Sequence, residues 1–344
     1  MILPIGVYSS MFETNYHNCD ISNKKFLIAG GAGFIGSNLV EYLLNYKAGK
    51  VRVFDNLSNG YYKNIEPFLS NPAFEFINGD LLDETACINA CKGIDIVFHQ
   101  AALGSVPRSI KTPLATNAAN VTGFLNMLTA AKDAGVSRFI YASSSSVYGD
   151  NQLMPKKEEI TGNALSPYAV TKRVNELYAK VYGETYGIKT IGLRYFNVFG
   201  PKQNPKNPYA AVIPLFVYAL LDGKPPIING DGEQSRDFTF VENVVQANIC
   251  AAFTEHPDAF NKVYNAAIGD SISLNDLYNY LQEISGIKIP AKYTDPRPGD
   301  IRDSQADITL AKNLLGYSPK FKVKEGLEIL FNWYKVNREF LDKE

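Results

Sequence analysis

The sequence predicts an α/β fold, in which a doubly wound parallel sheet carries a smaller C-terminal α/β lobe. Two observations support this prediction. Short apolar strands alternate with amphipathic helices from residue 24 to residue 196, a rhythm typical of parallel strands joined by helical crossovers. The chain of 344 residues is also longer than one small core requires, so a second unit is expected after the alternation ends.

The strands and helices of the predicted sheet follow from the period of their apolar residues. Strands are expected at 26–29, 51–55, 73–77, 94–98, 138–142 and 189–194. Helices are expected at 35–46, 83–92, 113–134 and 167–186. Residues 241–254 have the pattern of a further helix that returns to the sheet, and residues 325–340 that of a last amphipathic helix.

These patterns predict three parts of the chain. A leader at 1–23 is expected to pack on the first domain. The sheet domain is assigned to 24–196 and about 241–268, and the lobe to 197–240 and 269–344.

The composition argues against several classes of partner. Lys and Arg number 34 and Asp and Glu 35, so neither nucleic acid nor an acidic membrane is expected to bind. The sequence has no apolar run of the roughly eighteen residues that a membrane span needs, and the leader lacks a basic region typical of signal peptides. The four cysteines do not form a zinc pattern. We therefore expect a cytoplasmic protein with reduced thiols and no metal.

A glycine-rich turn lies between the first strand and the first helix. Its sequence is Gly-Gly-Ala-Gly-Phe-Ile-Gly at 30–36. Glycine at Gly30, Gly33 and Gly36 permits a tight turn, close approach of a pyrophosphate, and close packing of helix on strand. The helix then offers free N–H groups and a positive dipole end to phosphate. The turn predicts a dinucleotide site.

Two acidic residues follow the next strands. Asp55 ends the second strand, 25 residues after Gly30. A carboxylate there can accept both ribose hydroxyls and repels a 2′-phosphate, so NAD is favoured over NADP. Asp80 follows the third strand and either meets the adenine edge or caps the next helix.

Tyr168 and Lys172 are four residues apart on a predicted helix and therefore share one face. A nearby ammonium and an oxidised nicotinamide favour the phenolate of a tyrosine, which can then take a proton from an alcohol. Ser144 lies in a serine-rich segment after the fifth strand, where ligands bind in open α/β sheets. Its hydroxyl can hold the substrate oxygen.

These motifs resemble the extended short-chain dehydrogenase/reductase family with its Rossmann-type sheet, and within it UDP-hexose 4-epimerases. The resemblance covers about residues 24–335. It implies that Ser144, Tyr168 and Lys172 are catalytic and that NAD stays tightly bound and is regenerated in each turnover. It also implies cofactor contacts by Gly30, Gly33, Phe34, Ile35, Gly36, Asp55, Asp80, Leu81, Ala101, Ala102, Asn120, Tyr168, Lys172 and Tyr195.

The same resemblance implies how a UDP-sugar is held. Arg236 and Arg297 match phosphate clamps, and Asp300 matches a contact to the uridine ribose. Guanidinium groups suit diphosphate oxygens. Asn197 is expected at the diphosphate, and Val212 in the uracil pocket. The remaining substrate contacts that the resemblance implies are Gly104, Ser105, Ser144, Ser145, Ser146 and Ser304. Dehydratases and decarboxylases of the family carry acidic residues where Ser145 and Ser146 stand, so epimerisation at C4 of the sugar is the reaction implied.

Two departures bear on the sugar. Ser304 stands where galactose-type epimerases tend to have tyrosine, and Gly104-Ser105 begins a run found in epimerases of N-acetylated sugars. The resemblance therefore favours interconversion of UDP-GlcNAc and UDP-GalNAc, with surface-polysaccharide synthesis as the expected pathway. UDP-N-acetylglucosaminuronate, with Arg108 as a partner for its carboxylate, and UDP-glucose stay open. A family member that binds nucleotide without catalysis, and a net dehydrogenase, are the alternatives from other classes.

The sequence also bears on packing and assembly. His99 is expected to be a packed core histidine. Glu158 and Glu159 are expected on a solvated face. The resemblance also implies a homodimer that pairs two helices of each subunit.

Overall fold

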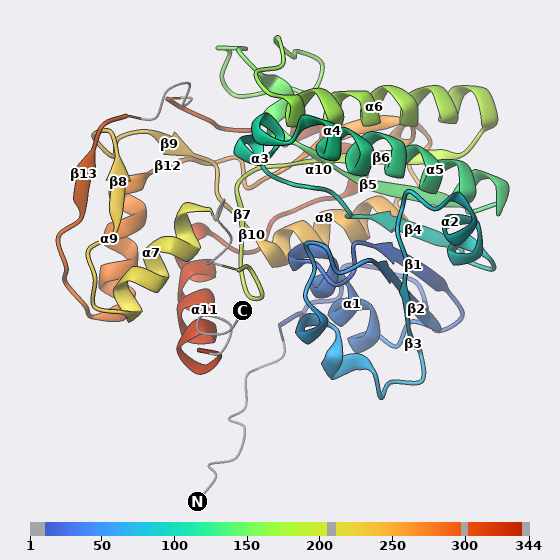
Figure 1. Cartoon of the computed structure of the whole chain (residues 1–344), viewed down its shortest axis with the longest axis horizontal. Coiled ribbons are helices and arrows are strands. Elements are labelled where there is room, and N and C mark those ends of the chain that lie inside the picture. The colour runs from blue at the N-terminus through green and yellow to red at the C-terminus, as the bar shows by residue number, and fades with distance from the viewer. Residues whose placement is uncertain (1–10, 205–210, 297–301, 339–344) are drawn as a thin grey trace, which may run out of the picture.

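The computed structural model describes residues 11–204, 211–296 and 302–338, and its largest feature is a parallel sheet (Figure 1). Its strand order is β11-β6-β5-β4-β1-β2-β3. The six predicted strands are present, and β11, which sequence analysis did not identify as a strand, is the seventh. The bounds are β1 Lys25–Ala29, β2 Lys50–Asp55, β3 Phe74–Asn78, β4 Ile96–His99, β5 Arg138–Ser144, β6 Lys189–Tyr195 and β11 Lys262–Ala266. The strand order changes direction between β1 and β4, a switch point at which doubly wound sheets bind ligands.

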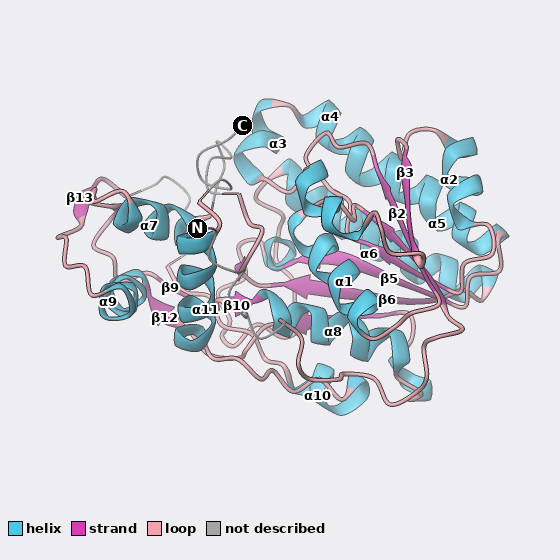
Figure 2. Cartoon of the chain, turned by 90° about the horizontal axis from the view of Figure 1, so that it is seen from below, coloured by secondary structure: helices cyan, strands magenta, loops and turns pink. Residues whose placement is uncertain are grey.

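The sheet is covered by helices on both faces (Figure 2). Strand β1 shows why: Phe26 and Ile28 point into a cluster with α1, α8 and α10, whereas Leu27 and Ala29 point into a cluster with α2, α5 and α6. A strand buried on both faces has a continuous apolar sequence. The helices are α1 Phe34–Asn45, α2 Glu84–Cys91, α3 Val106–Lys111, α4 Pro113–Asn117, α5 Gly123–Asp133, α6 Pro167–Tyr186, α8 Val241–Phe253 and α10 Thr309–Leu315.

The single helix predicted over 113–134 is interrupted in the structure. Helix α4 ends at Asn117, a π-helical turn spans Ala118–Thr122, and α5 starts at Gly123. Such turns widen a helix locally and occur at functional sites. The short helix α3 just before it was not expected from the sequence. The prediction of one regular helix was wrong because the apolar period does not report a change in hydrogen-bond register.

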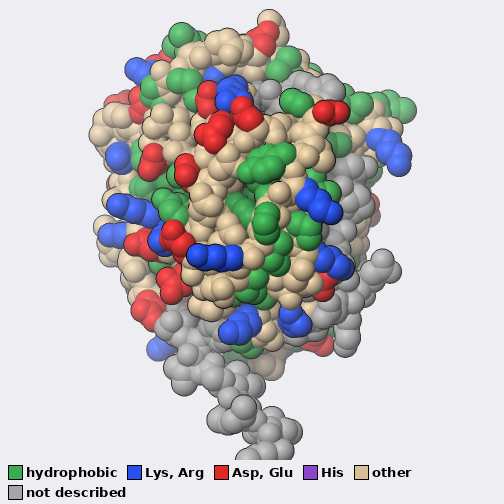
Figure 3. Space-filling view, turned by 90° about the vertical axis from the view of Figure 1, so that its left-hand side faces the viewer, with side chains coloured by type: hydrophobic (Ala, Val, Ile, Leu, Met, Phe, Trp, Pro, Cys, Tyr) green, Lys and Arg blue, Asp and Glu red, His purple; other side chains and the backbone are tan. Residues whose placement is uncertain are grey.

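The lobe has an apolar core of its own. Helices α7 Val212–Leu221, α9 Leu274–Ser285 and α11 Val323–Val336 surround a second buried cluster. Short strands complete the lobe and its link to the sheet: β7 Val198–Phe199, β8 Ile227–Asn229, β9 Ser235–Arg236, β10 Thr239–Phe240, β12 Ile272–Ser273 and β13 Lys292–Thr294. On the outer face of the lobe, charged side chains of both signs are interspersed with apolar ones (Figure 3). The core of the lobe is thus separate from that of the sheet, whereas α10, which the prediction placed in the lobe, packs on the sheet.

The described part of the leader packs against α1 and α8 of the sheet domain, as expected from the sequence. The Phe12 ring lies edge-on to Tyr42, with centroids 5.7 Å apart. The Tyr16 hydroxyl donates to Glu242 Oε1 at 2.7 Å, and His17 Nδ1 lies 2.8 Å from the Tyr42 hydroxyl. Among the described helices, none is both long and apolar enough to cross a membrane.

Candidate active site

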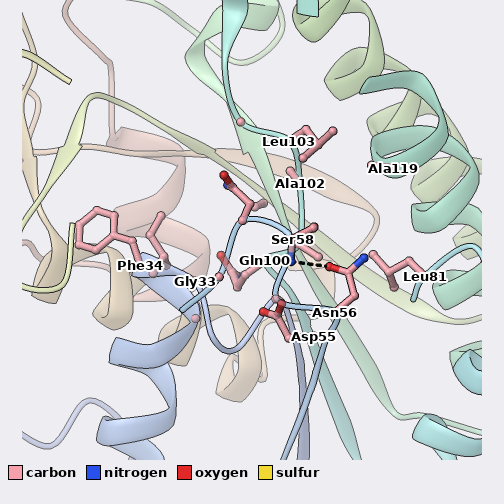
Figure 4. Close-up of a pocket in the computed structure, with 18 of the residues that line it drawn as sticks. Gly33, Phe34, Asp55, Asn56, Ser58, Leu81, Gln100, Ala102, Leu103 and Ala119 are labelled. Atoms are coloured by element: carbon pink, nitrogen blue, oxygen red, sulfur yellow. Dashed lines mark hydrogen bonds between the residues drawn. The ribbon is translucent and has the colours of Figure 1, made fainter. Parts of the chain in front are cut away.

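A cavity of about 670 Å³ opens at the carboxyl ends of the strands. Figure 4 shows residues from the ends of β1, β2, β3 and β4 converging on it. Most of the predicted cofactor residues and three of the predicted substrate residues line it: Gly30, Gly33, Phe34, Ile35, Gly36, Asp55, Asp80, Leu81, Ala101, Ala102, Gly104, Ser144, Tyr168, Lys172, Tyr195 and Asn197. Segments from across the sheet domain and the start of the lobe therefore meet in one place.

The glycine turn leaves room that any side chain would fill. Gly30 has φ +81°, and a Cβ there would lie 2.5 Å from the backbone nitrogen of Ala101. A Cβ on Gly36 would lie 2.2 Å from the Gly30 carbonyl oxygen. Helix α1 begins after Gly33 with no side-chain cap on its first N–H groups. An open backbone cradle with free donors fits the pyrophosphate of a dinucleotide.

Asp55 closes the cradle on the side of β2. Its Oδ2 accepts from the Ala32 N–H at 3.0 Å and its Oδ1 from the Leu57 N–H at 2.8 Å. Burial raises the pKa of this carboxyl, and the two backbone donors oppose the rise. Each carboxylate oxygen keeps a second lone pair, so both can still accept from ribose hydroxyls. The acceptor oxygens of Asp55, together with the N–H donors of the cradle, fit NAD.

Asp80 does not cap the following helix. Its Oδ1 accepts from the Leu82 N–H at 2.9 Å and its Oδ2 from Asn56 Nδ2 at 3.1 Å. The cap of α2 is Asp83, so the capping alternative was wrong. The exposed Asp80 carboxylate at the cavity wall agrees with the other alternative, a contact to the adenine edge.

Helix α6 brings the predicted catalytic side chains to the cavity. Ser166 caps it by accepting from the Ala169 N–H at 3.1 Å, and Pro167 occupies its first turn. Lys172 Nζ lies 6.0 Å from the centre of the Tyr168 ring and donates to the Ala142 carbonyl at 2.7 Å. Ser144 ends β5, two residues after Ala142, and its Oγ accepts from the Ser146 N–H at 3.2 Å. The Ser144 side chain is also hydrogen-bonded to Tyr168, so the serine and the tyrosine meet at one point of the cavity.

Burial dominates the electrostatics of this group. It raises the pKa of Tyr168, and the neighbouring Ser144 hydroxyl lowers it in part. Burial also lowers the pKa of Lys172 to about 8, against the attraction of the Glu176 carboxylate. An alcohol-deprotonating tyrosine therefore needs further positive charge beside it, which an oxidised nicotinamide would bring.

A buried ion pair stands behind the cavity. Arg194, which is fully buried, donates through Nε and Nη2 to the two oxygens of Glu176 at 2.8 and 2.9 Å. Ser143 Oγ donates to the same carboxylate at 2.7 Å. Glu158 was expected on a solvated face, but it is buried and accepts from the Asn265 N–H at 2.8 Å. That expectation was wrong because a tertiary contact with β11, invisible in the local sequence, satisfies the carboxylate. Glu159 is exposed.

Two other polar residues have structural surroundings. Asn120, in the π-helical turn, accepts from the Leu103 N–H at 2.8 Å and donates to Thr171 Oγ1 at 3.1 Å. It does not line the cavity, so it braces the wall next to Tyr168 and Lys172. His99 is stacked on Phe139, and burial lowers its pKa to about 3. His99 is thus a packed core histidine, as predicted.

A second, smaller cavity of about 170 Å³ lies in the lobe and shares one lining residue with the first. Asn197 lines both cavities, and Val212 and Arg236 line the second. The predicted contacts Ser105, Ser145, Ser146 and Ser304 line neither. Ser105 instead caps α3 by accepting from the Arg108 N–H at 3.2 Å, and the Ser304 N–H donates to the Ser235 carbonyl at 3.2 Å, next to Arg236. Arg297 and Asp300 lie outside the described residues.

Several residues at the first cavity had no signal in the sequence. Tyr61, Lys202, Gln203 and Asn204 also line it. They come from two loops, and Tyr61 and Asn204 are 143 positions apart. Neither loop contains a motif that points to the other. Arg108 donates through both terminal nitrogens to Asn59 Oδ1 at 3.2 Å, so its side chain lies against one of these loops.

Comparison with known proteins identifies the family. The model of the NAD dependent epimerase/dehydratase family matches residues 26–267. The UDP-N-acetylglucosamine 4-epimerase structure from Methanobrevibacter ruminantium, in complex with UDP-N-acetylmuramic acid, is 41% identical, with TM-score 0.85 and coverage of 91% of this chain and 98% of that one. The UDP-glucuronic acid 4-epimerase from Bacillus cereus, with UDP-glucuronic acid and NAD, is 32% identical, with TM-score 0.83 and coverage of 91% and 99%.

A relative compared by sequence agrees with these structures. The UDP-glucose 4-epimerase of Mycolicibacterium smegmatis is 35% identical over 88% of this chain and 95% of its own length. All three relatives are similar over nearly their whole length. The fold, the glycine cradle with Asp55, and these similarities lead to one conclusion: the chain belongs to the NAD dependent epimerase/dehydratase family.

Proposed function

We propose that this protein is an NAD-dependent UDP-hexose 4-epimerase, an isomerase that inverts C4 of the sugar through a 4-keto intermediate. The observation that carries the proposal is the meeting of Ser144, Tyr168 and Lys172 in the cavity that also contains the glycine cradle. The UDP-sugar 4-epimerases among the relatives support the substrate class.

In the proposed reaction, each side chain has one task. NAD bound in the glycine cradle would supply reversible hydride transfer and a positive charge beside Tyr168. The Tyr168 phenolate takes the proton of the 4-hydroxyl. It returns the proton after the 4-keto sugar has rotated to present its other face. The Ser144 hydroxyl donates a hydrogen bond to the reacting oxygen. The Lys172 ammonium, held by the Ala142 carbonyl, stabilises the phenolate.

The nucleotide is proposed to bind in the lobe. Asn197 lies at the junction of the two cavities, and Arg236 and Val212 line the second. A guanidinium at Arg236 suits the diphosphate, and Val212 suits the face of uracil. Arg297 as a phosphate contact and Asp300 as a ribose contact are proposed from the family resemblance alone.

UDP-GlcNAc, interconverted with UDP-GalNAc, is the proposed sugar. The support is Gly104 at the first cavity and, from the family resemblance, the small side chain of Ser304, whose N–H donates to the strand that carries Arg236. A void gives tolerance, while preference needs polar contacts, so UDP-N-acetylglucosaminuronate and UDP-glucose are the alternative substrates. For the carboxylated sugar, Arg108, which donates to Asn59, is the proposed partner of the carboxylate.

We extend the proposal to a homodimer in the cytoplasm that pairs helices of the sheet domain. The support is an apolar strip on α6, where Val170, Leu177 and Val181 are 49%, 52% and 51% exposed. Their spacing places them on one helix face.

The test is epimerisation without added NAD. The purified protein is incubated with UDP-GlcNAc, UDP-glucose or UDP-N-acetylglucosaminuronate, and the anomeric protons are followed by NMR. Rapid formation of UDP-GalNAc, with slower formation of UDP-galactose, is the expected result. No conversion of any of the three sugars, with and without added NAD, would contradict the proposed activity. Steady accumulation of reduced dinucleotide would instead indicate a net dehydrogenase.

A further inference from the structure

A loop that follows β7 lies against the wall of the cofactor cavity. Lys202, Gln203 and Asn204 line this cavity together with Tyr61, which belongs to the loop after β2. The loop of residues 201–204 therefore comes from the start of the lobe and reaches the helix and the turn that form the dinucleotide cradle. We call residues 201–204 the clasp loop.

One end of the clasp loop is bound to α1. Lys202 Nζ lies 2.7 Å from Glu41 Oε2 and donates to the Ser37 carbonyl at 3.3 Å. Asn38 Nδ2 donates to the Pro201 carbonyl at 3.3 Å. The Lys202 and Glu41 side chains are only 13% and 25% exposed, so solvent screens this ion pair less than an ordinary surface pair. The start of α1 faces the pyrophosphate cradle. The contacts with the clasp loop lie one to two helical turns after this start.

The other end of the clasp loop is bound to the loop after β2. Asn204 Nδ2 donates to the Tyr61 hydroxyl at 2.6 Å. The Tyr61 N–H in turn donates to the Ala32 carbonyl at 3.0 Å, inside the glycine turn. From the lobe, the Tyr334 hydroxyl donates to the Gln203 carbonyl. The clasp loop thus joins three parts of the molecule around one cavity.

The backbone of the clasp loop supports a functional role. Lys202 has φ +70°, a left-handed conformation that side-chain-bearing residues rarely adopt. Such a residue persists only where its surroundings hold it, and these cases concentrate at ligand clamps. Here the ion pair to Glu41 and the Lys202 ammonium 5.3 Å from the centre of the Phe68 ring hold it.

We propose that the clasp loop retains NAD between turnovers, with the Lys202–Glu41 ion pair and the Asn204–Tyr61 hydrogen bond as its two fastenings. The inference rests on the proposed function, because an epimerase that restores its cofactor in every turnover has no need to release it. Release of the dinucleotide then requires the clasp loop to part from α1 and from Tyr61. Glu41 and Tyr61 are positioning residues in this proposal, since they act through the loop.

The test measures release of NAD directly, without any sugar. Holoprotein is mixed with excess ethanol and alcohol dehydrogenase, which reduces each dinucleotide that leaves, and the absorbance of the reduced product is followed. Glu41→Gln and Tyr61→Phe each remove one fastening. Glu283→Gln is the matched control, because Glu283 pairs with Lys324 at 2.7 Å on the exposed surface of the lobe. Thermal unfolding of each variant verifies that it is folded.

We expect Glu41→Gln to release NAD about five to ten times faster than the parent protein, where tenfold corresponds to about 1.4 kcal/mol. Tyr61→Phe should be about two to five times faster, and Glu283→Gln unchanged. Release at the parent rate by both Glu41→Gln and Tyr61→Phe would overturn the proposal. The proposal would also be overturned if Lys202→Met released NAD quickly while Glu41→Gln and Tyr61→Phe released it at the parent rate. Lys202 would then hold the dinucleotide directly. If the protein released NAD slowly but epimerised no sugar, the proposed role of the clasp loop would be retained. The proposed function would be refuted.

Discussion

At the scale of single residues, the proposed chemistry depends on side chains that α6 presents on one face. Tyr168 and Lys172 lie four residues apart and share the cavity with Ser144. The Lys172 ammonium donates to Ala142 at the end of β5, so strand and helix fix the positions of the three groups together. Loss of one of these groups should therefore change the chemistry more than the fold.

Tyr168→Phe should abolish proton transfer and leave the fold intact. A positioned general base contributes about 10²- to 10⁴-fold, so we expect kcat for the UDP-sugar to fall by at least 10². The NMR assay of epimerisation measures this. Tyr178→Phe on the same helix, where the ring is 36% exposed, is the control and should keep full activity. Equal activity of the two variants would refute Tyr168 as the base.

Lys172 should make the stability of the apoprotein depend on pH. Burial lowers its pKa from 10.5 to about 8, so between these values the unfolded chain binds more protons than the native one. The free energy of unfolding should therefore rise with pH from about 8 to 10.5, by up to about 3 kcal/mol. Lys172→Met lacks this group, so the difference between parent and variant in urea unfolding isolates it. A difference that is constant across this window would show that burial does not lower the pKa of Lys172.

At the scale of elements, the start of α1 is the part most sensitive to added volume. Gly36 packs against the Gly30 carbonyl, which lets helix and strand approach closely. Interruption of the 113–134 helix by a π-helical turn is the other element-scale feature. It places Asn120 where it braces Leu103 and Thr171.

Gly36→Ala should disrupt the cradle. Its Cβ would lie 2.2 Å from the Gly30 carbonyl oxygen, so either the turn or the helix must move. We expect a loss of about 2–3 kcal/mol of stability from this overpacking and loss of bound NAD. The control is Gly93→Ala, where a Cβ meets nothing within 4 Å and only the φ of +67° is unfavourable. That variant should lose about 1 kcal/mol and keep its NAD. Calorimetry and the NAD content of the purified proteins provide the readouts.

At the scale of the whole molecule, buried polar groups connect the lobe to the sheet. The Asp237 carboxylate, at the junction, accepts from the N–H groups of Ile268, Gly269 and Ala306 at 3.1, 3.0 and 3.2 Å. Two of these residues follow β11, and the third lies in the C-terminal part of the chain. One fully buried side chain thus holds three segments that the sequence separates widely.

Asp237→Asn should loosen this junction. Its amide nitrogen would face backbone N–H groups and could not accept from them, which leaves buried donors unsatisfied at a cost of about 1–3 kcal/mol each. We expect a loss of at least 2 kcal/mol, measured by urea unfolding. Asp270→Asn, at an exposed aspartate nearby, should change stability by less than about 0.5 kcal/mol. Parent-like stability of Asp237→Asn would mean that the carboxyl is not required as an acceptor.

The local sequence was sufficient for much of the fold and of the candidate site. The apolar rhythm predicted six of the seven sheet strands. The glycine turn and the Tyr168–Lys172 pair were identified because each motif lies within a few residues, and Asp55 because it ends the strand that follows the turn. The structure then brings these motifs to one cavity. Their short range makes them visible in a single chain.

Tertiary structure alone decided the rest. Burial of Glu158, the Arg194–Glu176 pair and the contacts of the clasp loop join residues that are 107, 18 and up to 165 positions apart, respectively. Ser105, Ser145, Ser146 and Ser304 were predicted at the substrate, yet they line neither cavity, because resemblance assigns a position in a motif and says nothing of which way its side chain turns. Sequence by itself determined the family's chemistry and the periodic elements. Only the folded chain determined which charges are buried together, since burial depends on segments that no local pattern relates.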